Sequence, residues 1–147
     1  MATLENVRAG TAPAGLGTIA ASPAKQAFAI LYAGFCVLPI LAGLDKFFHW
    51  LVNWDQYLAP LATRIIPISG HTFMLVVGVI EIVAGLLVFA RPRIGAYVVA
   101  LWLWGIIVNL LLIPGFYDIA LRDFGLSLGA LALARLSAEF SPKQLGA

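Results

Sequence analysis

Four long apolar stretches limit the folds open to this chain more than any other feature. They cover approximately residues 27–49, 73–90, 94–113 and 117–136. A helix needs about 20 residues to cross a hydrocarbon core of roughly 30 Å. We therefore predict four transmembrane helices. Short turns, "RPR" at 91–93 and "PG" at 114–115, join the last three, so these should be sequential antiparallel neighbours. The expected fold is all-α, an integral membrane antiparallel four-helix bundle.

Composition supports this class and excludes others. Hydrophobic residues make up 62% of the chain and charged residues only 11%, far from the composition of a soluble domain. The net charge of +2 and the lack of a basic run argue against nucleic-acid binding. The single cysteine, Cys36, excludes a disulfide within one chain and is interpreted as a buried structural residue.

The two ends of the chain differ in composition from the apolar stretches. Residues 1–24 are rich in Ala, Gly, Thr and Pro, and we expect a disordered N-terminal tail before a four-helix domain at 25–137. Residues 138–147 form the expected C-terminal tail. Ser22 and Pro23 are typical of an N-cap and a first helical turn.

The distribution of Lys and Arg predicts the orientation. Six lie on the side of the chain ends and three on the other, namely Arg8, Lys25, Arg91, Arg93, Arg135 and Lys143 against Lys46, Arg64 and Arg122. Cytoplasmic segments of membrane proteins carry the excess of positive charge. We therefore expect a multi-pass protein of the bacterial cytoplasmic (inner) membrane with both termini in the cytoplasm.

The loop between the first two helices is the only long one. Its sequence "WLVNWDQYLAPL" (50–61) places Trp50, Trp54, Tyr57 and Leu61 at helical spacing, which favours a short amphipathic interfacial helix. An aromatic belt on an irregular loop fits the same residues equally well.

Charged and amide residues interrupt the apolar helices on stripes that also hold small side chains. Because small residues let helices approach closely, we expect these stripes to face the bundle interior. The predicted stripes are Gly34, Leu38, Leu41, Asp45 and His49; Gly78, Glu81 and Gly85; Gly105 and Asn109; and Asp118, Arg122, Gly125, Gly129 and Ala132.

All of these polar groups fall in the outer half of the predicted bilayer. A charge facing lipid costs several kcal/mol, so we predict one buried polar cluster. Its members are Asp45, Lys46, Glu81, Asn109, Arg122 and Asp123. With three acids and two bases, one carboxyl lacks a full partner, and Glu81, the deepest, is the candidate for holding a proton. The cluster could equally serve only to fix the helix register.

Three segments carry a resemblance to a known family. "GLDKFFH" (43–49), "GVIEIVAGLLVF" (78–89) followed by "RPR", and "ALRDFGLSLGALAL" (120–133) resemble the DoxX/DoxD family of small four-helix bacterial membrane proteins. The resemblance covers residues 28–136. It implies a membrane subunit of a redox system, with a quinone as cofactor and an oxidoreductase partner. The larger second subunit of the family's thiosulfate:quinone enzyme has no counterpart in this chain, so a full reaction would need that partner.

A quinone site needs an apolar cleft, hydrogen-bond donors and a nearby proton acceptor. Lys46, Asn109 or Arg122 could donate, Glu81 or Asp45 could accept, and Trp50 or Trp54 could line the mouth. The candidate catalytic residues are therefore Glu81, Asp45, Arg122 and Asp123, and the candidate quinone-binding residues are Lys46, Asn109, Trp50 and Trp54.

Other interpretations of the same residues remain open. Intramembrane charges also mark transport paths, and four helices would then require a homo-oligomer. A purely structural anchor or assembly factor is a third hypothesis. We predict no metal or haem centre, because lone interfacial histidines are more often solvated. His49 and His71 are the residues that would hold one, with Asp45 or Asp55 as a third ligand to a divalent metal.

Overall fold

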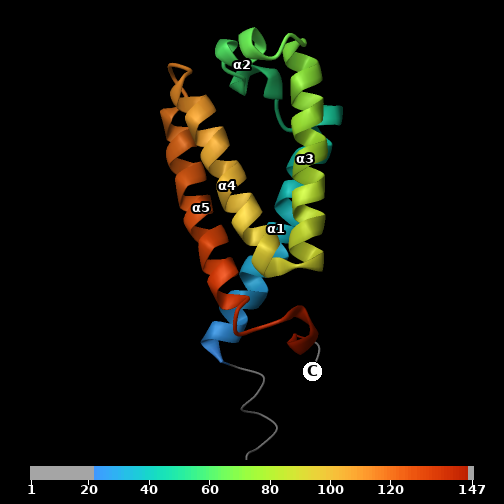
Figure 1. Cartoon of the computed structure of the whole chain (residues 1–147), viewed down its shortest axis with the longest axis vertical. Helices are drawn as coiled ribbons and strands as arrows, with labels where there is room; N and C mark the ends of the chain where they lie inside the picture. Colours follow the sequence, from blue (N-terminus) through green and yellow to red (C-terminus); the bar gives the residue numbers. More distant parts are fainter. Residues whose placement is uncertain (1–21, 146–147) are drawn as a thin grey trace, which may run out of the picture.

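The computed structural model describes residues 22–145, and the predicted N-terminal tail lies almost wholly outside this range. Within it, four long helices pack antiparallel: α1 (Pro23–Phe48), α3 (Gly70–Ala90), α4 (Pro92–Leu111) and α5 (Tyr117–Leu136). In Figure 1, both ends of the described chain lie at one end of the bundle, and α2 lies at the other. The predicted all-α four-helix architecture is confirmed.

Local sequence signals explain where the helices begin and end. The Ser22 hydroxyl accepts a hydrogen bond from the Lys25 amide, and Pro23 opens α1, as predicted. α1 ends at His49, whose left-handed conformation (φ 53°) stops the helix. Arg91 alone separates α3 from α4, because Pro92 starts a new helix. Gly115, at φ 101°, makes the turn before α5.

The connecting segment between α1 and α3 (residues 50–69) contains two short helices rather than one. A 3₁₀ helix, η1, covers Trp54–Tyr57, and α2 covers Pro60–Ile65. The prediction of a short helical segment is confirmed, but a single amphipathic helix carrying Trp50 through Leu61 is wrong. Proline lacks the amide hydrogen that a continuing helix needs, so the chain is extended at Leu58 and Ala59 and restarts at Pro60.

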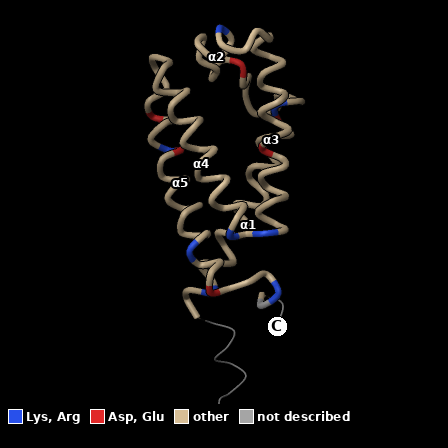
Figure 2. The backbone as a smooth tube through the Cα atoms, viewed as in Figure 1, with Lys and Arg blue, Asp and Glu red and all other residues tan. Residues whose placement is uncertain are grey.

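Three helices in the described part of the chain are long and apolar enough to cross a membrane, namely α1, α3 and α4. They indicate a multi-pass membrane protein. α5 has a similar length of 20 residues but contains Asp118, Arg122, Asp123 and Arg135. Figure 2 shows charges in the half of the bundle nearest α2 and again at the opposite end, with an uncharged stretch between.

The bundle is built from two helix pairs, α1 with α3 and α4 with α5. Glycines let α1 and α3 approach closely. A Cβ placed on Gly43 would lie 2.5 Å from the carbonyl oxygen of Gly78, and one on Gly78 would lie 2.8 Å from that of Gly43. The first pair therefore packs with its backbones nearly in contact.

The larger of two apolar core clusters among residues 22–145 lies toward the chain ends, and a smaller one of Ile107, Leu110 and Ala120 lies where α4 meets α5. In the larger cluster the first half of α1 and the second half of α3 meet the first half of α4 and the second half of α5. The buried residues of this core are Phe28, Phe35, Cys36, Ala84, Val88, Ala96, Val99, Ala100, Ala130, Leu133 and Ala134. Cys36 is a buried free thiol, as predicted. From the expected C-terminal tail, Phe140 and Leu145 also pack against this core.

The predicted interior stripes are partly wrong. Gly78, Glu81 and Gly85 are buried on α3, as expected. On α5, however, Asp118, Gly125 and Ala132 are exposed and line no cavity, and the buried face holds Ala120, Asp123, Ser127, Ala130, Leu133 and Ala134. On α1, Leu41 is exposed. Leu38, Gly105 and Arg122 are accessible but line the cavity between the two helix pairs, as an interior position predicts. Small residues mark a close contact only where a partner helix actually approaches.

Candidate functional site

A cavity of about 670 Å³ lies between the two helix pairs, on the side of the connecting segment. Figure 1 shows α3 and the α4–α5 pair diverging toward that end. All four long helices and the connecting segment contribute side chains. Most of the lining is apolar, and its polar or amphipathic members are Lys46, Trp54, Tyr57, Glu81, Trp102, Asn109, Arg122 and Asp123.

Two buried charges on the cavity wall form an ion pair between α1 and α3. Lys46 Nζ lies 2.6 Å from Glu81 Oε2, and the two residues are only 3% and 8% exposed. The same Nζ lies 3.8 Å from the centre of the Trp54 ring, in cation–π contact. Lys46 is thereby held between a carboxylate and an aromatic face, at the boundary between the helices and the connecting segment.

Glu81 also has a second neighbour across the cavity. The indole N–H of Trp102 on α4 interacts with the Glu81 carboxylate, but the approach falls short of a hydrogen bond. Trp102 Nε1 is therefore a buried donor without a hydrogen-bond partner within residues 22–145. Sequence reasoning missed Trp102. The signal that could have found it is its spacing: Gly105 and Asn109 follow at i+3 and i+7, which puts all three residues on one helix face.

Asp45 does not join the cavity. Its carboxylate accepts hydrogen bonds from the backbone amides of Trp50 (2.9 Å) and Leu51 (3.1 Å) and from the Trp54 indole (2.7 Å). Asp45 therefore binds the start of the connecting segment to the end of α1. It is buried and has no cation partner among the described residues. Of the three acids in the predicted cluster, Asp45 rather than Glu81 is the one left without a base.

Asn109 likewise anchors the connecting segment, from α4. Its side chain donates to the Tyr57 carbonyl (2.6 Å) and accepts from the Ala59 amide (2.9 Å). Tyr57 is the last residue of η1 and Ala59 is the N-cap of α2, so neither of these backbone groups has a helical partner. Asn109 borders the cavity, but its amide is already engaged on both sides.

Arg122 and Asp123 pair with each other on α5. Arg122 Nη2 and Nε lie 2.9 and 3.0 Å from Asp123 Oδ1. Asp123 is buried, whereas the Arg122 side chain is 62% exposed. The predicted single cluster of six residues is therefore wrong as a network. It separates into two ion pairs and two anchors of the connecting segment, although five of the six members line one cavity.

The two tryptophans expected at the mouth have different positions. Trp54 lines the cavity, whereas Trp50 is 80% exposed, stacks on Phe48 at 4.7 Å and takes no part in the lining. The histidines lie outside the cavity. His49 and His71 have ring centroids 5.5 Å apart, near the connecting segment.

Comparison with known protein families, curated proteins and solved structures gave no match to this chain. The residues around the cavity are therefore the main basis for a function.

Proposed function

We propose that this protein is a membrane subunit of a redox system and that its cavity holds the headgroup of a quinone. The observation that best supports this proposal is a mostly apolar cavity of about 670 Å³ with the buried Lys46–Glu81 pair in its wall. Ligand sites typically occupy roughly 300–1,000 Å³ and combine apolar walls with a few placed polar groups. The size and lining of this cavity agree with that description.

The polar groups suit a planar ligand bearing carbonyl oxygens. An ammonium group has three N–H donors, and Glu81 is the one acceptor that Lys46 contacts in the described chain. The Trp102 indole N–H is buried and lacks a hydrogen-bond partner. These two donors would bind carbonyl oxygens, while the aromatic side chains of Trp54 and Tyr57 would cover the ring.

Reduction of a quinone to a quinol takes up two electrons and two protons. Glu81 and Lys46 are the groups of this chain placed to pass protons to the bound headgroup, because they are paired with each other and border the cavity. The electrons would come from an oxidoreductase partner, as the resemblance to the DoxX/DoxD family implies. The cavity residues would bind and orient the ligand.

We also propose that α5 crosses the bacterial inner membrane together with α1, α3 and α4. Asp123 is buried and paired, and Asp118 lies in the first turn of α5, where a carboxylate is favourable. The Arg122 side chain is long enough to extend its charge toward the lipid headgroups. A fourth crossing would place the chain ends on one side, in the cytoplasm.

The test is quinone binding by the purified full-length chain in mild detergent. A short-chain benzoquinone should quench tryptophan fluorescence saturably, because Trp54 and Trp102 line the cavity. Gly105→Leu should weaken this binding at least tenfold, because Gly105 lines the cavity and a Cβ there meets nothing within 4 Å. Gly125→Leu is the matched control, since that glycine is equally uncrowded but does not line the cavity.

Two further results bear on the proposal. Gentle purification from native membranes should yield bound quinone and a co-purifying oxidoreductase. If quinone quenches both glycine variants and the wild type with equal affinity, the cavity is not its site. A protein free of quinone and of any partner would instead favour a structural anchor, or transport by a homo-oligomer.

A further inference from the structure

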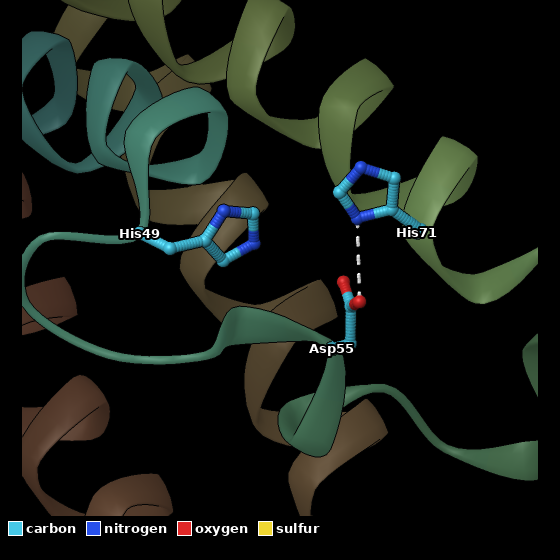
Figure 3. A group of neighbouring side chains, drawn as sticks. All are labelled: His49, Asp55 and His71. Atoms are coloured by element: carbon cyan, nitrogen blue, oxygen red, sulfur yellow. Dashed lines mark hydrogen bonds and ion pairs between the residues drawn. The ribbon is translucent and has the colours of Figure 1, made fainter.

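Three side chains with metal-binding atoms meet outside the cavity, near the connecting segment. They are His49 at the end of α1, Asp55 in η1 and His71 in the first turn of α3. One ligand atom from each lies within 4.8 Å of the other two. Figure 3 shows the His49 ring and the Asp55 carboxylate directed toward the same region as His71.

We infer that these three residues form a binding site for a divalent transition metal, with Zn²⁺ the best fit. Two imidazole nitrogens and one carboxylate oxygen form a donor set that zinc accepts with a fourth position left open. This inference does not depend on the proposed quinone site, because none of the three residues lines the cavity.

The distances require only a small closure. In a tetrahedral site with Zn–N and Zn–O bonds of about 2.0–2.1 Å, neighbouring ligand atoms lie about 3.3 Å apart. His71 Nδ1 and Asp55 Oδ2 are already 3.3 Å apart. A rotation of the His49 side chain would complete the set, since all three ligand atoms lie within 4.8 Å of one another.

A further observation points to a missing ligand. Asp55 Oδ2 lies beside His71, but Asp55 Oδ1 is buried and has no hydrogen-bond partner in the described chain. Buried carboxylate oxygens are normally satisfied, and a cation shared by the two Asp55 oxygens would satisfy this one.

The local sequence fixes the approach of the ligands. The Asn53 side chain accepts a hydrogen bond from the Asp55 amide and so sets the start of η1. The Ser69 hydroxyl accepts from the Thr72 amide, which caps α3 and places His71 in its first turn. A metal bound here would join the ends of α1 and α3 to η1. It would hold Trp54 and Tyr57, which lie in η1, over the cavity.

The experiment uses the full-length protein in mild detergent, purified with an affinity tag free of histidine and stripped with a chelator. Isothermal titration calorimetry with Zn²⁺ should show one binding site per chain. Titration with Co²⁺ should produce the visible absorption of a four-coordinate ion. Zn²⁺, but not Mg²⁺, should raise the thermal midpoint and slow amide exchange in residues 50–58, because binding favours the folded connecting segment.

His71→Gln and Asp55→Asn should each weaken Zn²⁺ binding at least about tenfold. His49→Asn is a third test, since asparagine tolerates the left-handed conformation but removes the imidazole. Asp118→Asn is the control, because it removes an exposed carboxylate from another helix and should leave the affinity unchanged. Absence of saturable binding to the wild type would overturn the inference. Equal affinity in wild type, His71→Gln and Asp55→Asn would also overturn it.

Discussion

The Lys46–Glu81 pair connects α1 to α3, and both side chains are almost fully buried. Removing two charges from water costs several kcal/mol each, and their attraction offsets that cost only while both partners remain. The cation–π contact with Trp54 adds to the attraction on the lysine side. The pair is therefore more sensitive to loss of one member than to replacement of both.

Single and double replacements of this pair should differ in a characteristic way. Glu81→Leu leaves the Lys46 ammonium buried without a counterion and should destabilise the protein by about 3–5 kcal/mol. The double variant Lys46→Met/Glu81→Leu should recover most of this loss, because neither buried charge remains. The free energy of unfolding of the single and double variants can be measured by following the helical circular dichroism signal during unfolding in mixed detergent micelles. A double variant as unstable as the sum of the two single variants would show that the pair is not the coupled unit described.

Sequence reasoning at the residue scale identified the right polar residues but not their partners. A charge within an apolar helix is conspicuous, so Glu81, Asp45 and Asp123 were predicted to lie inside, and all three are buried. Their partners depend on side-chain reach and on the path of the connecting segment, neither of which periodicity encodes. This is why Asp45 binds backbone amides of Trp50 and Leu51 rather than a cation.

Among the elements, α1 and α3 pack with their backbones nearly in contact, and two glycines of α1 differ sharply in their surroundings. Gly43→Ala should destabilise the protein by about 1–3 kcal/mol, because the added methyl group meets backbone atoms of α3. Gly34→Ala should stabilise it by about 0.5–1 kcal/mol, because nothing lies within 4 Å of the new Cβ and alanine favours a helix. The test is to measure the free energy of unfolding of the two variants in parallel. Equal changes in this free energy would rule out the predicted close contact at Gly43.

Helix positions were more predictable than helix faces. Length and hydropathy located the four long helices to within a few residues, because these properties are intrinsic to each segment. Which face of a helix is buried depends instead on where the neighbouring helices lie. On α5, the Gly125 side of the helix resembles the packed Gly78 side of α3 in sequence, yet no helix lies against Gly125. In a helix that is apolar nearly all round, hydropathy gives little indication of which side meets protein and which meets lipid.

For the molecule as a whole, the proposed crossing of the membrane by α5 has a direct test. Single cysteines in a Cys36→Ser background can test it with a thiol reagent that does not cross membranes. Arg93→Cys, in the first turn of α4, and Ala138→Cys, after α5, should react only in permeabilised cells. Pro114→Cys, between α4 and α5, should react once the outer membrane alone is opened. All three positions are exposed.

The labelling pattern separates orientation from the number of crossings. If Ala138→Cys reacts together with Pro114→Cys, α5 does not cross. If Pro114→Cys reacts only in permeabilised cells while the other two react without permeabilisation, all four helices cross in the inverted orientation. The orientation predicted from the distribution of Lys and Arg would then be wrong.

The larger apolar core lies toward the chain ends and meets the cavity at Phe35, Ala84 and Val99, and both ends of the described chain leave from the side of that core (Figure 1). A helix of 20 residues is about 30 Å long. A fluorescent reporter or surface tether placed next to the described ends, at Ser22 or Leu145, would thus be separated from the connecting segment by most of the bundle's length. Forms of the protein immobilised or fused there should leave the connecting segment and the mouth of the cavity free, which makes these positions suitable attachment points for a biosensor.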